Sequence, residues 1–226
     1  DQFEALPPEA FGGFQPGHIK QLPKEFFAEF NPNEFRELPP NAMGGFNPQT
    51  FGTLPPDAMG GFKPEQFAAL PPKVVGGLQP DQFEALPLDA FGGFQPGHIK
   101  KLPKDFFAEF EPKAFQELPP DAMSGFKPKT FESLPAEAIG GISADQMENL
   151  KPNLFVGIQP SAFEVMPAEA FQGFQPGQLK KLPNDLLAEM DPASFGEINA
   201  DAFAGFKPKK FNDLPDQLIS QIDADQ

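Results

Sequence analysis

The sequence predicts an all-α protein, a solenoid or superhelix of very short helices with one helix in each eight-residue repeat. Three observations favour this fold. Leu-Pro pairs recur in equal steps at Leu6, Leu22, Leu38 and onward to Leu134, and phenylalanines midway between them set an eight-residue basic step, the octad. Prolines and acidic residues stand where each helix would begin, which suits the first helical turn. Glycines stand near where each helix would end.

The octad keeps its phase along the whole chain. With Leu6 as position 1, positions 1 and 6 are apolar as far as Ile222 and Ile219, without an insertion or a deletion. Positions 5 and 6 and the next position 1 share one face of a helix. A helix of one and a half turns is unstable alone. We therefore expect residues 1–226 to form a single continuous solenoid, in which each buried Phe or Leu contributes about 1.5–3 kcal/mol.

Two other folds fit the sequence less well. A β-solenoid also has short repeats, but Val, Ile and Thr are sparse, and the frequent prolines would remove hydrogen bonds from the ladder. Disorder conflicts with the density and regular phase of the aromatic residues, because 28 of the 226 residues are Phe.

Two longer periods lie above the octad. Odd octads are LPPxAFGG-like and even octads are FxPxxFxx-like, so the repeat is a 16-residue pair. We expect the two types to occupy non-equivalent sites, with Gly-Gly at a sharp exit or at a close backbone contact. An 80-residue super-repeat gives blocks 1–80, 81–160 and a partial 161–226. Both ends fall inside an octad, so we expect the chain to be a slice of a longer array.

Composition and motifs narrow the function classes. The net charge of −15 argues against a nucleic-acid partner. The chain has no cysteine, which excludes disulfides and thiol chemistry. We expect no membrane span, since no apolar run approaches about 18 residues. G-x-S-x-G, G-x-G-x-x-G and H-E-x-x-H are all absent, so we expect neither catalytic residues nor a cofactor.

The two histidines are the obvious candidates for chemistry. His18 and His98 are equivalent residues 80 positions apart, and Gln178 replaces them in the third block. A metal site needs several convergent ligands, so we interpret these residues as polar residues at helix starts and expect no metal site there. Most carboxylates suit helix N-termini and solvated faces, with weak Ca²⁺ binding between stacked octads as the alternative.

A basic cluster and an apolar doublet recur once in each block. The candidate anion-binding or partner-binding residues are Lys20, Lys24, Lys100, Lys101, Lys104, Lys180 and Lys181. Their alternative role is charge balance with nearby carboxylates, namely Glu25, Glu29, Asp105, Glu109, Asp185 and Glu189. The candidate apolar contacts are Phe26, Phe27, Phe106, Phe107, Leu186 and Leu187. Each doublet either widens the core or offers an exposed contact to a partner.

One unit suggests a family. The unit ISADQMENL, residues 142–150, has the same shape as INADAFAGF at 198–206 and IDADQ at 222–226. These units resemble the octapeptide arrays of the form L-T-x-x-Q-h-x-x-L in large secreted bacterial proteins, including adhesin-like and haemolysin-like surface proteins. The resemblance implies a secreted or cell-surface location and a spacer or interaction role, and it supplies no catalytic residue.

Two function hypotheses follow. The first is a non-enzymatic structural or adhesive repeat region that acts as an elongated spacer or stalk. Its partners would be other copies or segments of the array, a cell-surface protein or a polysaccharide. The second is a ligand-binding solenoid whose Lys/Phe units hold an acidic glycan, a peptide or an apolar ligand. An enzyme ranks third, because no catalytic motif is present.

Overall fold

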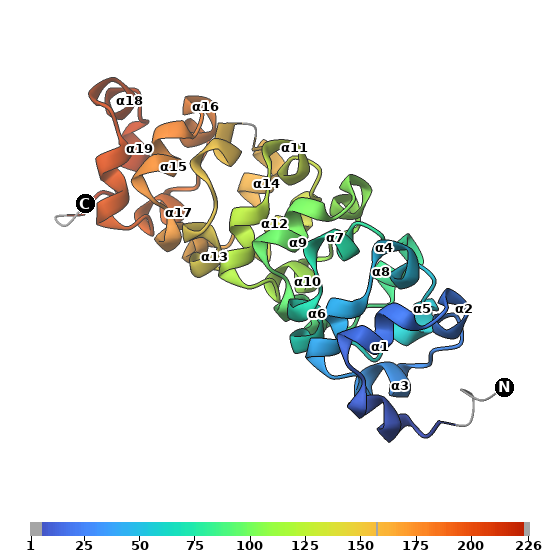
Figure 1. Ribbon diagram of the computed structural model, residues 1–226. Helices are drawn as coiled ribbons and strands as arrows, with labels where there is room; N and C mark the ends of the chain where they lie inside the picture. The colour runs from blue at the N-terminus through green and yellow to red at the C-terminus, as the bar shows by residue number, and fades with distance from the viewer. Residues whose placement is uncertain (1–5, 157, 224–226) are drawn as a thin grey trace. The chain divides into compact units, whose positions relative to one another are not determined.

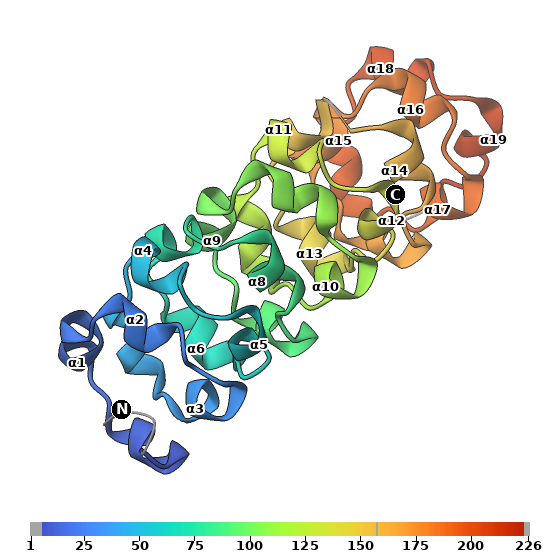
Figure 2. The same cartoon turned by 90° about the vertical axis from the view of Figure 1, so that its right-hand side faces the viewer.

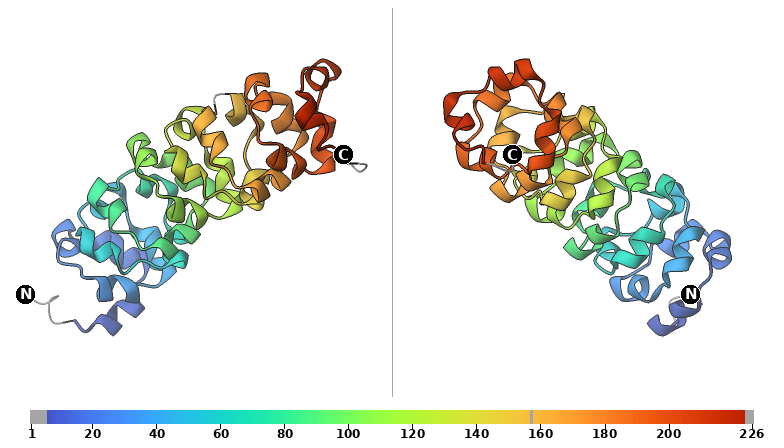
Figure 3. Two further views of the ribbon diagram at one scale, coloured as in Figure 1. Left: turned by 180° about the vertical axis from the view of Figure 1, so that it is seen from behind. Right: turned by 90° about the vertical axis from the view of Figure 1, so that its left-hand side faces the viewer.

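A computed structural model describes residues 6–156 and 158–223 of the protein. Within these ranges the chain forms short α-helices and 3-10 helices joined by extended links, and no strand occurs (Figures 1 and 3). The prediction of an all-α protein with short, regularly spaced helices is confirmed. The last residues of the IDADQ unit, 224–226, lie outside the described residues.

The chain divides into two compact units. Unit 1 comprises Asp1–Phe106 and Glu117–Pro119, and unit 2 comprises Phe107–Gln116 and Pro120–Gln226. Within each unit, the main helix–helix contacts join helices that begin three octads apart, as α3 at Pro32 and α5 at Pro56 do. Each unit therefore sorts its helices into three stacks.

Unit 1 has three stacks, and Figure 2 labels their α-helices except α7. The first contains η1 (Pro8–Gly13), α3 (Pro32–Glu37), α5 (Pro56–Met59) and α8 (Pro80–Glu84). The second contains α1 (Pro16–Gln21), η2 (Pro40–Gly45), α6 (Pro64–Ala69) and η3 (Leu88–Gly93). The third contains α2 (Lys24–Phe27), α4 (Pro48–Phe51), α7 (Pro72–Val75) and α9 (Pro96–Lys101). The next helix is η4 (Lys104–Glu109).

Unit 2 repeats the arrangement. Its first stack contains η5 (Pro120–Gly125), α13 (Ala144–Glu148), η7 (Ala168–Gly173), α17 (Pro192–Gly196) and α19 (Asp216–Ile219). Its second contains α11 (Pro128–Phe131), η6 (Pro152–Val156), α15 (Pro176–Lys181) and η8 (Ala200–Gly205). Its third contains α10 (Pro112–Gln116), α12 (Ala136–Ile139) and α14 (Pro160–Glu164). The unit also contains α16 (Asn184–Ala188) and α18 (Pro208–Asn212).

The two octad types pack on each other. Helices that pack on each other lie three octads apart along the chain. Because three is an odd number, an odd-numbered octad always packs on an even-numbered one. Thus η2, from an odd octad, lies between α1 and α6, and η7 lies between α13 and α17. Odd and even octads therefore alternate along each stack.

Local sequence explains the helix ends. Proline at the first helical position leaves no backbone donor unpaired, and the residue before it often caps the helix. In α3, Asn31 Oδ1 accepts hydrogen bonds from the backbone N–H groups of Asn33 and Glu34 at 2.9 and 3.1 Å. Glu34 Oε2 accepts from the Asn31 N–H at 3.0 Å, which completes a capping box. Eight octads form 3-10 helices among the described residues, in which i→i+3 hydrogen bonds close each turn.

Phenylalanine and leucine fill the space between stacks. Phe35, Phe67 and Phe115 are fully buried. Aromatic ring pairs also join segments far apart in the sequence, as in Phe67 and Phe94, whose ring centroids are 4.1 Å apart. The glycine at position 8 of the odd octads allows a close backbone contact. A Cβ on Gly45 would lie 2.5 Å from the carbonyl oxygen of Pro16, at the start of the helix α1 on which η2 packs. Close packing, rather than a sharp exit, therefore requires this glycine.

Candidate interaction surface

Buried polar side chains at position 5 of the even octads connect their own helix to backbone 28–31 residues earlier in the chain. Their members are Gln66, Gln82, His98, Gln146 and Gln178, each at most 1 % exposed. In the described residues, every buried side-chain nitrogen and oxygen has a hydrogen-bond partner. Burial of these groups is tolerated because each of them is paired on both sides.

Gln178 shows the geometry. Its Oε1 accepts a hydrogen bond from the Gln175 backbone N–H at 2.9 Å, at the start of its own helix α15. Its Nε2 donates to the carbonyl oxygens of Met147 and Leu150, both at 2.8 Å. Those carbonyls lie in the last turn of α13 and just beyond its end, and the carbonyl of Met147 also accepts from the Leu150 N–H at 3.1 Å. The amide thus caps the start of α15 and bonds to the end of α13, and so joins the two helices.

His98 takes the same place as the glutamines. Its Nδ1 accepts from the Gln95 N–H at 3.1 Å, and its Nε2 lies 2.8 Å from the Leu70 carbonyl oxygen. The neutral tautomer with the proton on Nε2 satisfies both contacts. Burial lowers the pKa of His98, and the hydrogen bond to Leu70 opposes this only in part. His18 makes the same bond to the Gln15 N–H at 3.1 Å but is exposed.

The lysines predicted as a cluster are all exposed, but the structure distributes them over different helices. Lys20 lies on α1 and Lys24 on α2, in two stacks of unit 1. Lys100 and Lys101 lie on α9, whereas Lys104 begins η4. Each block holds ten octads, which make three steps of three octads and one octad more. Within unit 1, the equivalent Lys20 and Lys100 therefore fall on different stacks, the second and the third.

Packing of helices brings other lysines together. In unit 2, α11, η6 and α15 are consecutive members of one stack. We define the basic face by their exposed lysines, which are Lys127, Lys129, Lys151, Lys180 and Lys181. Glu132 is the single carboxylate within these three octads. In unit 1, α7 packs on α9, and this contact places Lys73 of α7 on the same stack as Lys100 and Lys101 of α9.

A neighbouring stack of unit 2 has the opposite charge. We define the acidic face by the exposed carboxylates of η5, α13, η7, α17 and α19 with their caps, namely Asp121, Asp145, Glu148, Glu169, Asp191, Glu197 and Asp216. No Lys or Arg occurs in these helices or in the residues that cap them. Among the residues that the structure describes, no lysine of the basic face has an ion-pair partner within 4 Å. The exposed lysines of the basic face thus lack a close ion pair with the described carboxylates.

The apolar doublets lie mostly in the core. Phe27 and Phe107 are fully buried, and Phe106, Leu186 and Leu187 are at most 4 % exposed. Phe26 is half-buried and packs edge-on against Phe27 and Phe30. This burial favours the wider core over an exposed apolar contact.

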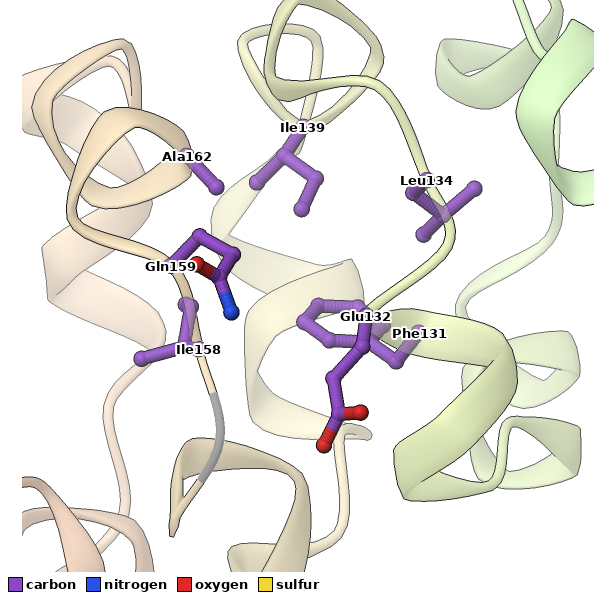
Figure 4. A pocket seen from close by; sticks show the side chains of 7 residues that line it. All are labelled: Phe131, Glu132, Leu134, Ile139, Ile158, Gln159 and Ala162. Atoms are coloured by element: carbon purple, nitrogen blue, oxygen red, sulfur yellow. The ribbon is translucent and has the colours of Figure 1, made fainter.

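One cavity of unit 2 is too small for an organic ligand. A cavity in unit 2 of about 10 Å³ is lined by Phe131, Glu132, Leu134, Ile139, Ile158, Gln159 and Ala162 (Figure 4), and it is at the lower limit for one water molecule. Within residues 6–156 and 158–223, no group of three or more His, Cys, Asp or Glu side chains is placed to hold a metal ion. The same residues contain no helix of the length and apolarity needed to cross a membrane.

Sequence reasoning missed the buried amides and the grouping of the lysines. The first had a signal, because Gln recurs at position 5 of even octads, as in the unit ISADQMENL. The grouping of the lysines becomes visible only when lysines three octads apart are compared, because those octads pack on each other, instead of lysines ten octads apart. No protein-family model matches the chain, and no characterised protein matches its sequence significantly.

Proposed function

We propose that the chain is a non-enzymatic, extracellular structural and adhesive repeat region, which acts as an elongated spacer or interaction stalk. In this proposal the three stacks of each unit are the three sides of a solenoid with three octads per turn. Length then grows with the number of octads, while the cross-section stays constant. No residue is assigned to catalysis, and no cofactor is needed.

The observation that carries the proposal is the three-octad spacing of the helix contacts. Helix α6 contacts η2 and η3, and α15 contacts η6 and η8, so each helix packs on one helix before it and one after it. Such nearest-neighbour packing is typical of quasi-one-dimensional proteins. The buried amides support the same reading, because Gln66 and Gln178 both bond to carbonyls of the preceding turn, those of Phe35 and Leu38 and those of Met147 and Leu150.

Small-angle X-ray scattering tests the spacer. The full chain is compared with a variant in which residues 142–189, six octads or two turns, are duplicated in tandem. An even number of octads keeps odd octads on even ones. Since packed helices lie about 8–10 Å apart, we expect the maximum dimension to increase by about 16–20 Å, with the cross-sectional radius unchanged. A wider particle of unchanged length would refute the proposal.

Location is tested separately. Antibodies against the chain should stain intact, unpermeabilised cells of the source organism, and mild protease treatment should remove the signal. Staining that needs permeabilised cells would contradict an extracellular role while leaving the spacer geometry untouched.

The second candidate is ligand binding through the basic cluster. It is favoured by the exposure of Lys100, Lys101 and Lys104. Changing these three lysines to Glu should abolish retention of the chain on an immobilised acidic glycan. Equal retention of the altered and unaltered chains would exclude this role for them.

A further inference from the structure

We propose that the basic face of unit 2 binds the acidic face of a second copy of this chain, so that copies associate side by side. This inference goes beyond the spacer role. It depends on helix contacts within unit 2 and not on the length or location of the whole array.

The two faces carry opposite charges, and the acidic face contains no basic residue. The basic face carries five lysines and one glutamate in its three octads, whereas the acidic face carries seven carboxylates and no basic residue. All five lysines and all seven carboxylates are exposed. Within the part of the chain that the structure describes, the lysines have no ion-pair partner in their own molecule. Both faces therefore remain available to another molecule.

The spacing of the two faces matches, because one geometry generates both. Each face gains one helix for every three octads, and stacked helices lie about 8–10 Å apart. Rows of lysines on one copy can therefore meet rows of carboxylates on another without a mismatch that accumulates along the stack. A partner with an unrelated repeat distance would pair at one row and miss the next.

The net charge of −15 does not prevent this contact. At physiological ionic strength, repulsion between exposed charges is screened beyond about 8 Å, whereas facing rows would lie closer than that. Several opposed charges also act together, whereas a single exposed surface pair contributes little. Local complementarity then decides the orientation of the two molecules.

The two faces differ, so the association is heterologous. A copy bound through its basic face keeps its acidic face free for the next copy, and assembly continues unless geometry closes a ring. We therefore expect species larger than a dimer as protein concentration rises.

Sedimentation velocity of the full chain tests the proposal in 50 and 500 mM NaCl. Two triple variants reverse one face each: Lys127→Glu, Lys151→Glu and Lys180→Glu, or Asp121→Lys, Glu148→Lys and Glu169→Lys. A matched control changes the net charge by the same amount as the first variant, but at three lysines outside the basic face: Lys113→Glu, Lys207→Glu and Lys209→Glu. Far-UV circular dichroism verifies that each variant is folded.

We expect the unaltered chain and the control to associate in low salt and to separate in high salt. Each reversed variant alone should associate at least tenfold more weakly, and an equimolar mixture of the two should recover association. A chain that stays monomeric in both salts would overturn the proposal, as would a control that weakens association as much as the first variant. Lysine-dependent binding of heparin by a monomeric chain would also overturn it, since the partner would then be a polyanion.

Discussion

The glycine at position 8 of an odd octad provides a sharp test of close packing between turns. Gly44 and Gly45 are neighbours in η2, but only Gly45 faces another helix. A Cβ on Gly45 would lie 2.5 Å from both Pro16 O and Ile19 Cβ, while a Cβ on Gly44 would meet no atom within 4 Å. The pair is therefore a matched contrast within one helix.

The expected magnitude follows from these distances. Carbon atoms in contact are about 3.5–4.0 Å apart, so the new methyl group of Gly45→Ala overlaps its neighbours by about 1 Å. Overpacking of this kind costs about 1–3 kcal/mol, and we expect about 2–3 kcal/mol because a backbone carbonyl is among the atoms that must move. Gly44→Ala should instead stabilise by about 0.4–1 kcal/mol, since it restricts the unfolded chain. No described glycine has a positive φ that would oppose this change.

Urea denaturation followed by circular dichroism at 222 nm measures the difference. The two variants should differ in stability by about 2.4–4 kcal/mol. With a urea dependence of about 1–3 kcal/mol per molar, Gly45→Ala should unfold at a midpoint about 0.8–4 M below that of Gly44→Ala. Equal midpoints for the two variants would refute the reasoning, because they would mean that no helix lies against Gly45.

Three further predictions concern unit interiors. Gln178→Met keeps the volume but removes three hydrogen bonds from the side chain to backbone groups, so it should cost about 2–4 kcal/mol in the same assay. Gln217→Met, at an exposed amide, should cost under about 0.5 kcal/mol. The pKa of His98 is lowered in the folded state, so the unfolded chain binds more protons and stability falls as pH drops below about 6.5. Urea midpoints from pH 7.5 to 5 should show that His98→Gln removes this loss and that His18→Gln does not. Ile158→Phe should fill the cavity of Figure 4 and raise the thermal midpoint; a lower midpoint would mean that the site cannot accept the ring.

Much of the fold follows from the sequence because it depends on local chemistry. Residues close in sequence predict the proline at the helix start, the Asn31 cap and the burial of Phe35. The packing partner of each helix is not, because the octad sets the length of each helix and leaves open which helix it packs on. That choice depends on contacts such as Gly45 with Pro16 and Gln66 with Phe35, which join residues 29 and 31 positions apart.

The candidate surface was predictable to a similar degree. Lysines on short helices with an apolar face were expected to be exposed, and they are. Their grouping was not predictable, because Lys101 and Lys104 are neighbours in sequence but belong to successive helices, whereas Lys73 and Lys101 are brought close by packing. The carbonyl oxygen of Lys101 lies 3.3 Å from the position of a Cβ on Gly76, at the end of the helix that carries Lys73.

Cysteine cross-linking tests most directly the central claim that a helix packs on the helix three octads away. The chain has no cysteine of its own. A Cβ on Gly177 would lie 3.6 Å from the Cβ of Pro152, within the range of about 3.5–4.5 Å for a disulfide. Under mild oxidation, the variant with Pro152→Cys and Gly177→Cys should close an intramolecular disulfide, seen by non-reducing mass spectrometry. The variant with Ser161→Cys and Gly177→Cys, two octads apart and on different stacks, should stay reduced. A disulfide in the second variant, with free thiols in the first, would contradict the claim that each helix packs on the helix three octads away.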